Sequence, residues 1–270
     1  GFYGGQNGFF RNQFDGGRAD LINEFGGKGR LLWHPTGRLA FDFMADYQYT
    51  RQNGFPYGQL VTEDEIAAAP ITSPLYGLKA GTQSPDQNRQ SNYRRNILNT
   101  GAGIKYTGNG FDVNSMTSWQ YLHDYMLMDI DYRPQDFLHL IQRQHGNILS
   151  EELSVKSRNG SRWHWTFGAF GSYQWLKTSA PVYFDKDMNA FLSKTITDYA
   201  YNGILNSMAR GIAQGMIAGG MSKEAAEAAA RALAAANIAR TGGVNIDMAM
   251  DPVPGLFRTP TFNLGVYHES

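Results

Sequence analysis

Histidine is the residue of this sequence with the most versatile chemistry, because an imidazole can bind a metal ion or carry a proton near neutral pH. The chain has 6 histidines and no cysteine, and the histidines are His34, His123, His139, His145, His164 and His268. We expect His34 in a turn, His123 and His164 on strands, and His139 and His145 in a loop. Their spacing matches no HExxH-type motif. We therefore predict structural or surface histidines, with no metal site and no cofactor.

Carboxylates are the second group that could do chemistry. Asp129, Asp131 and Asp136 are spaced closely enough for a calcium loop, but the spacing and the glycine of an EF-hand are missing. Glu151 and Glu152 are adjacent on a predicted strand and point to opposite faces, so they cannot act together on one glycosidic bond. There is no phosphate-binding glycine loop and no G-x-S-x-G elbow. We predict a solvated acidic loop, no catalytic residues and no enzyme activity.

The composition excludes several other classes of protein. Lys and Arg number 24 and Asp and Glu number 24, so no net positive field recruits nucleic acid. No apolar run approaches the roughly 18 residues of a membrane-spanning helix. The abundance of glycine (31), Phe (16) and Tyr (15) is typical of a strand-rich protein with aromatic girdles. The chain starts without Met and without a visible signal peptide. We expect it to be a fragment of a longer protein.

Alternation with a period of two dominates the sequence and predicts long strands. The first covers about residues 18–33 and the second about 39–51, and further strands are expected at about 94–106, 111–126, 148–157, 162–177 and 258–267. One face carries residues such as Phe25, Trp33, Phe41 and Phe43. The opposite face carries polar side chains that we expect to meet water. On the first two strands these are Arg18, Asp20, Glu24, Lys28, Arg30, Asp42, Asp46 and Gln48.

The predicted connections alternate between short and long. Tight turns are expected at 34–38, 107–110 and 158–161, and longer connections at 52–92, 127–147 and 178–257. A membrane β-barrel has this asymmetry, with short turns at one end and long external loops at the other. Aromatic residues near the strand ends would form its interfacial girdles, among them Trp33, Tyr47, Tyr106, Trp163 and Trp175. The alternative is an ordinary β-sandwich core, but its inner face would not tolerate so many polar residues.

Helices are expected only within the long connections. Thr62 and Glu65 frame a short helix that ends before Pro70. Asp187 precedes a helix over about 188–218, and Ser222 opens a second helix that reaches Arg240. Together they predict a helical hairpin, an insertion of about residues 185–243 in an external loop.

Three segments of the chain resemble a known family. Ile148–Val155 (ILSEELSV), followed after a turn by Trp165–Tyr173 (WTFGAFGSY), resembles the mid-barrel hairpin of TonB-dependent outer-membrane receptors, and Thr261–Tyr267 (TFNLGVY) resembles the following strand. The resemblance implies an all-β fold, a partial antiparallel transmembrane β-barrel over residues 1–270. It would supply about seven of roughly 22 strands. The plug domain that occludes such barrels is absent from this chain.

The resemblance also implies a function and partners. The whole protein would import a scarce nutrient, most simply a ferric siderophore, across the outer membrane of a Gram-negative bacterium, energised by the TonB complex. Its partners would be outer-membrane lipid, the plug and the remaining strands. The polar residues named above would line the lumen. Nutrient would be captured on external loops by Tyr57, Tyr76, Tyr132, Arg133 and His139.

Other interpretations of the chain remain open at this point. Phe257–Pro260 (FRTP) differs at its third residue from the FRAP box of haem receptors, so haem is a lesser candidate for the nutrient. The barrel could instead be a passive, porin-like channel. A soluble carbohydrate-binding or hydrolytic β protein with a helical insertion would fold without detergent as a monomer.

Overall fold

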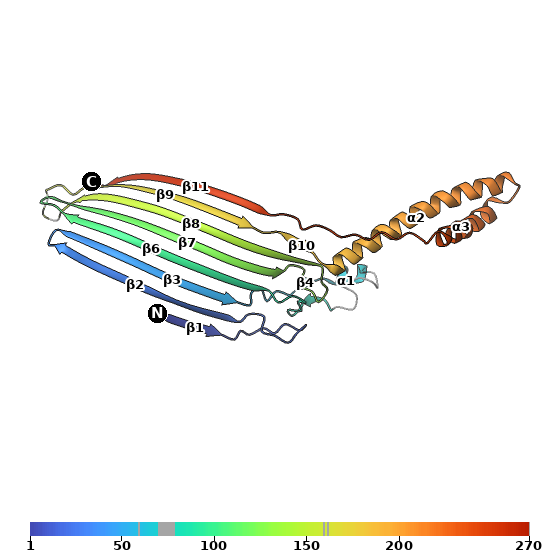
Figure 1. The fold of residues 1–270 in the computed structure, drawn as a ribbon, viewed down its shortest axis with the longest axis horizontal. Helices are drawn as coiled ribbons and strands as arrows, with labels where there is room; N and C mark the ends of the chain where they lie inside the picture. Colours follow the sequence, from blue (N-terminus) through green and yellow to red (C-terminus); the bar gives the residue numbers. More distant parts are fainter. Residues whose placement is uncertain (59, 70–78, 159, 161, 270) are drawn as a thin grey trace. The chain divides into compact units, whose positions relative to one another are not determined.

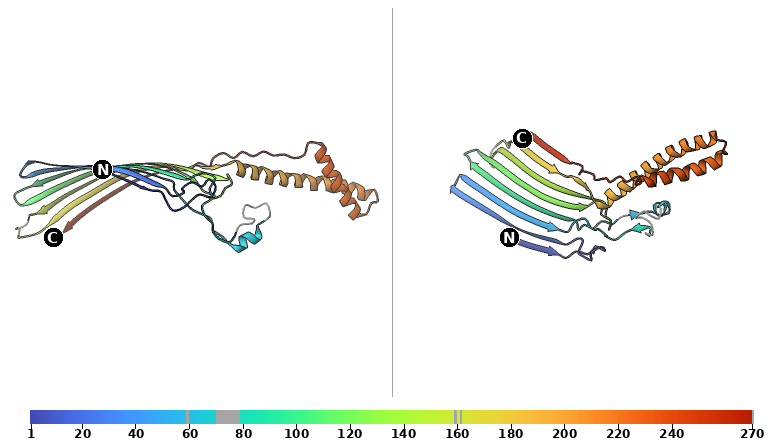
Figure 2. Two further views of the ribbon diagram at one scale, coloured as in Figure 1. Left: turned by 90° about the horizontal axis from the view of Figure 1, so that it is seen from below. Right: turned by 45° about the vertical axis from the view of Figure 1, so that its right-hand side comes forward.

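The computed structural model describes residues 1–58, 60–69, 79–158, 160 and 162–269. The chain divides into two units, one made of residues Gly1–Tyr183 and Pro252–Ser270 and the other of Phe184–Asp251. The first unit is a curved β-sheet and the second is helical (Figures 1 and 2). The two are therefore described one at a time.

The sheet consists of long antiparallel strands that follow the chain from one edge to the other (Figure 1). Its order is β1 (Phe2–Gln6), β2 (Ile22–Thr36), β3 (Leu39–Gln52), β6 (Asn92–Thr107), β7 (Phe111–Asp129), β8 (Leu138–Ser157), β9 (Thr166–Ser179) and β11 (Leu256–Glu269). The short β10 (Val182–Phe184) also pairs with β8. The sheet does not close on itself, and β1 and β11 are its edges. The predicted antiparallel fold of long strands is confirmed.

The register divides the side chains into two faces. Phe43 on β3 lies opposite Leu31 on β2 and Ala102 on β6. On the same face, near the other edge of the sheet, Tyr173 on β9 lies opposite Leu149 and Phe262. We call this the aromatic face. The polar face carries the alternate positions, including the paired Lys28 and Asp46 and the paired Asn99 and Gln120. The alternation of the sequence is therefore kept across all the long strands.

The sheet has almost no buried apolar core. Among the described residues of this unit, Ala19 and Val61 are the only fully buried hydrophobic side chains. Large apolar side chains of the aromatic face are exposed instead, as in Leu264 (74%) and Val266 (82%). A sheet that buries neither face within its own chain needs an apolar environment for one of them.

The two ends of the sheet differ as predicted. The connections after β2, β6 and β8 lie at one end, which we call the turn end (Figure 1). The connections after β1, β3, β7 and β9 lie at the other, the loop end. Those after β1, β3 and β9 are longer, whereas the connection after β7 (130–137) is only as long as the one after β8 (158–165) and much shorter than predicted. The connection after β3 contains β4 (Leu60–Val61), α1 (Glu63–Ala68) and β5 (Gly81–Thr82). In α1 the predicted cap is present: the Thr62 hydroxyl accepts from the Glu65 N–H and the Glu65 carboxylate accepts from the Thr62 N–H. The predicted stop at Pro70 lies outside the described residues.

Several predicted boundaries were wrong. The first long strand begins at Ile22 rather than at residue 18, and β2 extends through the predicted turn to Thr36, so His34 is on a strand. Residues 138–147 belong to β8 rather than to a polar loop, which places His139 and His145 on that strand. Polar side chains hid this extension, because His139–Asn147 lacks the apolar alternation that marks the second half of the strand. At the turn end, Trp163 and His164 precede β9, which begins at Thr166.

One short strand was missed altogether. β1 pairs with β2 from Phe2–Gly26 to Gln6–Ile22. Its sequence, FYGGQ, has two central glycines and little alternation, so no pattern marks it as a strand. This segment therefore forms a strand because it pairs with β2, not because of a pattern in its own sequence.

The helical unit is a hairpin of α2 (Lys186–Ala218) and α3 (Lys223–Arg240), within two residues of the predicted limits. Leu205 of α2 packs with Ala234 and Ile238 of α3 in a small core. Ala226, Ala230 and Ala234 are fully buried and follow the helical repeat on one side of α3. Among the described residues, no helix combines the length and the hydropathy needed to cross a membrane.

Candidate functional site

The loop end of the sheet brings three connections together. We call the described residues 7–21, 53–58, 79–91 and 130–137 the loop cluster. Backbone hydrogen bonds tie them: the Gln13 N–H donates to the Pro85 carbonyl at 2.8 Å and the Asn88 N–H to the Arg133 carbonyl at 3.1 Å. The connections are thus fixed to one another, not only to the strands that carry them.

A buried polar network holds the centre of the cluster. Asn12 (2% exposed) donates from Nδ2 to the Gln87 carbonyl and accepts from the Gln87 N–H, both at 2.8 Å. The Ser91 hydroxyl donates to Gln87 Oε1 at 3.1 Å and accepts from the Asp129 N–H at 3.0 Å. Four buried polar residues, from two connections and the end of β7, are thereby linked. Because buried polar groups are costly without partners, this network specifies one arrangement of the loops.

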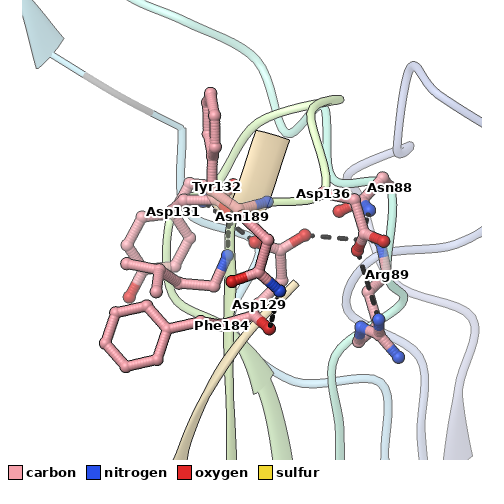
Figure 3. Close-up of polar contacts among 10 residues, drawn as sticks. Asn88, Arg89, Asp129, Asp131, Tyr132, Asp136, Phe184 and Asn189 are labelled. Atoms are coloured by element: carbon pink, nitrogen blue, oxygen red, sulfur yellow. Dashed lines mark hydrogen bonds and ion pairs between the residues drawn. The ribbon is translucent and has the colours of Figure 1, made fainter. Parts of the chain in front are cut away.

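Carboxylates shape the turn after β7 (Figure 3). Asp131 accepts from the N–H groups of Arg133, Phe137 and Leu138 at 3.0, 3.2 and 2.8 Å, so a single side chain closes the turn. Asp136 accepts from Asn88 Nδ2 at 2.8 Å and forms an ion pair with Arg89 at 3.2 Å. Two of the three aspartates considered for a calcium loop are thus engaged by protein donors, and the predicted solvated acidic loop is instead partly buried.

Asp129 has an unusual protonation equilibrium. It is the last residue of β7, at the loop end, where its carboxylate accepts from the N–H groups of Arg89 and Tyr132. Burial, reinforced by the neighbouring Asp131 carboxylate, raises the pKa of Asp129 to about 7. Burial also raises the pKa of Asp131. Two carboxyl groups this close cannot both ionise easily, so the pair retains a proton near neutral pH.

Aromatic residues of two connections meet beside this pair. The rings of Tyr57 and Tyr132 pack edge to face, with centroids 5.6 Å apart, and Tyr57 also contacts Phe55 at 6.0 Å. Phe55 and Tyr132 have positive φ angles of 64° and 55°, which are uncommon for residues other than glycine. Such backbone strain concentrates at functional sites, where the surrounding structure holds it in place.

A cavity of about 440 Å³ opens between the connections of the cluster. Its lining combines cations, a carboxylate, a phenol and amides, among them Lys79, Gln83, Asp86, Tyr132, Arg133 and Gln135. This volume falls within the usual range for small-molecule sites. The lining offers ion pairs and directed hydrogen bonds to a polar ligand.

The predicted ligand residues are only partly brought together. Tyr57, Tyr132 and Arg133 all lie in the loop cluster, and the last two line the cavity. Tyr76 lies outside the described residues. His139 is buried within β8, on the aromatic side of the strand, and stacks on Tyr183 with centroids 4.7 Å apart. Sequence reasoning missed Asn12, Gln87 and Ser91, because polar residues in loops give no sign that they will be buried.

The polar face carries six of the eight predicted lumen residues: Glu24, Lys28, Arg30, Asp42, Asp46 and Gln48. Arg30 forms a two-pronged ion pair with Asp42, with Nε 2.8 Å from Oδ1, and Asn99 donates to Asp46 at 2.9 Å. Arg18 and Asp20 precede β2. Asp20 caps the loop backbone by accepting from the N–H groups of Phe9 and Phe10. Whether the six line a lumen stays a prediction.

No group of three or more potential ligand side chains is arranged to hold a metal ion in the described part of the chain. The helical unit has a more open hollow of about 930 Å³ between α2 and α3, lined by polar residues such as Asn206, Arg210, Glu227 and Arg231. Its lining contains charged side chains of both signs, and it is more open than the cavity in the loop cluster. The loop cluster is therefore the better candidate for a binding site.

No protein-family model matches the chain, and no curated protein matches it. Among solved structures, the chain is similar to the ferric yersiniabactin uptake receptor FyuA from Yersinia pestis, with a TM-score of 0.49 and 18% identity. The similarity covers 67% of this chain and 26% of that receptor. The chain therefore spans about a quarter of the receptor's length.

Proposed function

We propose that this chain is part of the barrel wall and external loops of a TonB-dependent receptor in a bacterial outer membrane. The whole protein would capture a scarce nutrient, most simply a ferric siderophore, and import it past a plug. Its task is binding and passage, without covalent chemistry on the nutrient. Residues outside this chain would supply the plug, the further strands and the link to the TonB complex.

The division of the sheet into two faces is the observation that carries the proposal. On β3 the aromatic face is apolar from Phe41 to Tyr49 and turns cationic at Arg51. On β7 the corresponding stretch runs from Val113 to Tyr121, with Ser115 and Thr117 within it, and ends before His123. Both lengths match the roughly 9–11 residues that a tilted strand needs to cross a bilayer. The remaining length of each strand would project beyond the membrane on the loop side.

The aromatic face has the girdles expected of a membrane barrel. Trp33 and Tyr106 lie toward the turn end, and Tyr49, Tyr121 and Trp175 toward the loop end. One acidic side chain interrupts the face between them. Glu151 accepts hydrogen bonds from Ser115 at 2.6 Å and from Thr117, so neighbouring hydroxyls satisfy its carboxylate.

The free edges of the sheet support a larger barrel. β11 is 14 residues long and pairs with β9 on one side only, and β2 has a partner beyond Gly26 only on its β3 side. Long unprotected edges with exposed apolar side chains invite further strands. A closed barrel would pair both edges and place the polar face around a lumen.

The loop cluster supports the capture step. Its cavity combines Lys79 and Arg133 with aromatic surface from Tyr132. Cations and aromatic rings suit the anionic, often aromatic groups with which siderophores chelate iron. The same groups would suit other polar ligands, so the experiment must test the class of ligand as well as binding.

The test is uptake of radiolabelled iron by a strain that lacks the complete gene and is complemented with wild-type or variant protein. Wild-type cells should take up iron only from certain ferric siderophores and should stop when the proton gradient is collapsed. The double variant Lys79→Gln, Arg133→Gln should bind its ferric siderophore about tenfold more weakly or worse, because it loses charged hydrogen bonds. Arg162→Gln, at the turn end, is the matched control and should behave as wild type.

The rival functions predict different results. Uptake that persists without the proton gradient, together with steady ion conductance in planar bilayers, would identify a passive channel. A protein recovered from the soluble fraction as a stable monomer would contradict the membrane proposal as a whole. Energised uptake of another nutrient would retain the receptor and correct only the ligand.

A further inference from the structure

The hollow of the helical unit is a groove between α2 and α3, close to the tip where one helix turns into the other (Figure 1). We call it the hairpin groove, and we call residues 219–222 the tip. Its lining includes the small side chains of Ala209, Ala213 and Ala228. Because an alanine side chain protrudes little, further helices can approach α2 and α3 closely at these positions. The groove is therefore shaped to receive helices.

The charged side chains of the groove lie at two levels. On α3, Glu224 and Glu227 come soon after the first helical residue, and Arg231 follows two turns into the helix. With a rise of about 1.5 Å per residue, both acids lie within about 6 Å of the start of α3, and Arg231 lies about 12 Å from it. On α2, Arg210 lies about 13 Å below the tip by the same measure. The groove thus has an acidic level near the tip and a cationic level below it.

These charges are not neutralised within the hairpin. Among the described residues, Glu224, Glu227, Arg210 and Arg231 form no ion pair. Glu227 and Arg231 are one turn apart on α3 and still do not pair. The two arginines contact Asn206 instead: Arg210 Nε donates to its carbonyl at 3.2 Å, and Arg231 Nη1 donates to its Oδ1 at 3.5 Å. Charges of both signs therefore remain available to a partner.

The pattern of the groove is complementary to itself. When two copies lie antiparallel about a two-fold axis, the acidic level of each faces the cationic level of the other. The axis then passes midway between the levels, about 8 Å below the tip, at the height of Ala213 and Ala228. The smallest side chains lie where the helices must come closest. Lys223, nearest the tip, falls beyond the opposing arginines, at the height of Asn206.

We propose that the hairpin groove binds the hairpin groove of a second copy of this chain, so that four helices form an antiparallel bundle. Glu227 of each copy contacts Arg231 and Arg210 of the other, and the two Ala228 side chains meet close to the axis. The inference goes beyond the proposed function, because it concerns the helical unit alone and is the same for any nutrient.

Charge complementarity favours a second copy over other occupants. An acidic protein would be attracted by Arg210 and Arg231 but repelled by Glu224 and Glu227, and a basic protein would meet the reverse. A small ligand would find an open groove instead of the enclosing pocket that such ligands require. A second copy satisfies both charged levels at once.

The size of the contact sets its strength. Two helices, each about 10 Å wide and overlapping over about 20 Å, cover roughly 400 Å² on each copy. A standard interface buries about 800 Å² on each partner. The pairing is therefore weak and depends strongly on its ion pairs, so the test must capture a transient contact.

Cysteine cross-linking captures such a contact, and the chain contains no cysteine of its own. The test introduces Ala228→Cys into the complete protein and oxidises it mildly in intact cells. Ala236→Cys is the matched control, because Ala236 is exposed on the same helix but lies outside the groove. Ala228→Cys should give several-fold more disulfide-linked dimer than the control, since only a residue close to the two-fold axis meets its own counterpart. The unsubstituted protein accounts for cysteines outside this chain.

Charge reversal then tests the complementarity. In the Ala228→Cys protein, Glu227→Arg or Arg231→Glu alone should reduce the dimer about tenfold, because like charges then face each other. The two reversals combined should restore the dimer, because each level again meets its opposite. Both residues are exposed, so the single variants should keep the hairpin folded. Recovery in the combined variant also excludes unfolding as the cause of the loss.

Three results would overturn the proposal. The first is equal cross-linking through Ala228→Cys and Ala236→Cys, and the second is a combined reversal that stays as low as the single ones. The third is a cross-link from Ala228→Cys to a different protein in place of the dimer, which would assign the groove to another partner. None of these results bears on nutrient uptake, so the proposed function is tested separately.

Discussion

At the scale of single residues, Asp129 and Asp131 show how burial changes the behaviour of an ordinary side chain. Each takes hydrogen bonds from loop N–H groups, and together they sit where two ionised carboxylates would repel each other. The raised pKa of Asp129, about 7, therefore belongs to the arrangement of the loop cluster rather than to the residue type. Protonation and loop order are linked as a consequence.

We predict that the loop cluster loosens as the pH rises. The pKa of Asp129 lies above the value of roughly 4 in an unfolded chain, so the folded loops bind the proton more tightly. The resulting stabilisation is complete below about pH 4 and is lost as the pH rises through about 7. Hydrogen exchange of peptides covering residues 129–138, corrected for intrinsic rates, should show falling protection between about pH 5 and 8.

Asp129→Asn tests the origin of that pH dependence. The side-chain amide of the variant cannot titrate, so the hydrogen-exchange protection of residues 129–138 should vary much less with pH. The protection should also be lower at every pH, because one acceptor oxygen is lost. A slope equal to that of wild type would assign the effect to other groups.

We also predict that Asn12→Ala destabilises the packing of the connection after β1 against the connection after β3. The substitution removes both hydrogen bonds to Gln87 and leaves the Gln87 backbone groups buried without partners. The expected cost is about 1–3 kcal/mol in local stability. Limited proteolysis should then cut within residues 79–91 at least several-fold faster. Asn109→Ala, in the turn after β6, is the control and should leave that rate unchanged; equal cutting of both variants would contradict the role of Asn12.

At the scale of elements, glycine positions determine how β9 meets β11. Gly168 lies opposite Tyr267, and a Cβ built on Gly168 would lie 2.0 Å from Tyr267 Cζ. The missing side chain lets the Tyr267 ring lie across β9, where its hydroxyl donates to Glu152 of β8 at 2.7 Å. A glycine covered by a cross-strand aromatic ring pins the register of both strands.

Gly168→Ala should accordingly weaken the pairing of β9 with β11. The methyl group displaces the Tyr267 ring and breaks its bond to Glu152, so the unfolding temperature of the complete protein should fall by a few degrees. Gly171→Ala is the matched control on the same strand, because a Cβ there has no neighbour closer than 3.9 Å. Equal unfolding temperatures for both variants would show that the ring does not depend on Gly168.

Much of the element order was predictable from the sequence, and the reasons are local. A period of two, interrupted by Pro, Gly and Asn, marks β3, β6 and β7 to within a few residues, and Ser222 correctly marks the start of α3. The predicted cap of α2 was wrong: its N-cap is Asp185, and Asp187 lies in the first turn of the helix. The first half of β8 was not predictable, because His139–Asn147 has no apolar alternation and is ordered by β7 and β9. The loop cluster could be predicted only in part: Tyr132 and Arg133 stand out by type, whereas Asn12 and Gln87 acquire their role through contacts far apart in sequence.

At the scale of the whole molecule, the helical unit is attached through a narrow neck. Val182 and Val253 exchange backbone hydrogen bonds at 3.1 and 2.9 Å, and the Ala180 N–H donates to the Gly255 carbonyl at 2.6 Å. The two chain segments that lead into and out of the hairpin therefore run side by side within the sheet unit. The hairpin has its own small core around Leu205.

This neck predicts that the hairpin can be removed without loss of the sheet. Replacing residues 183–252 with Asn-Gly joins Val182 to Val253 by a two-residue turn, a length that suits antiparallel partners. The shortened complete protein should reach the outer membrane and resist unfolding in detergent as wild type does. Loss of assembly would show that α2 and α3 are required for the barrel itself. If assembly is kept but uptake falls, the hairpin contributes to capture.

The strict two-sidedness of the sheet also constrains how this protein can change over generations. Adding one residue in the middle of β7 would exchange later residues such as Tyr121 and Asp124 between the aromatic face and the polar face, unless a bulge absorbed it. Adding two would keep every later side chain on its side. Insertions and deletions inherited within strands should thus come in even numbers, while the connections at the loop end can gain or lose any number of residues. The loops would then be free to vary in length over a sheet whose two faces are conserved.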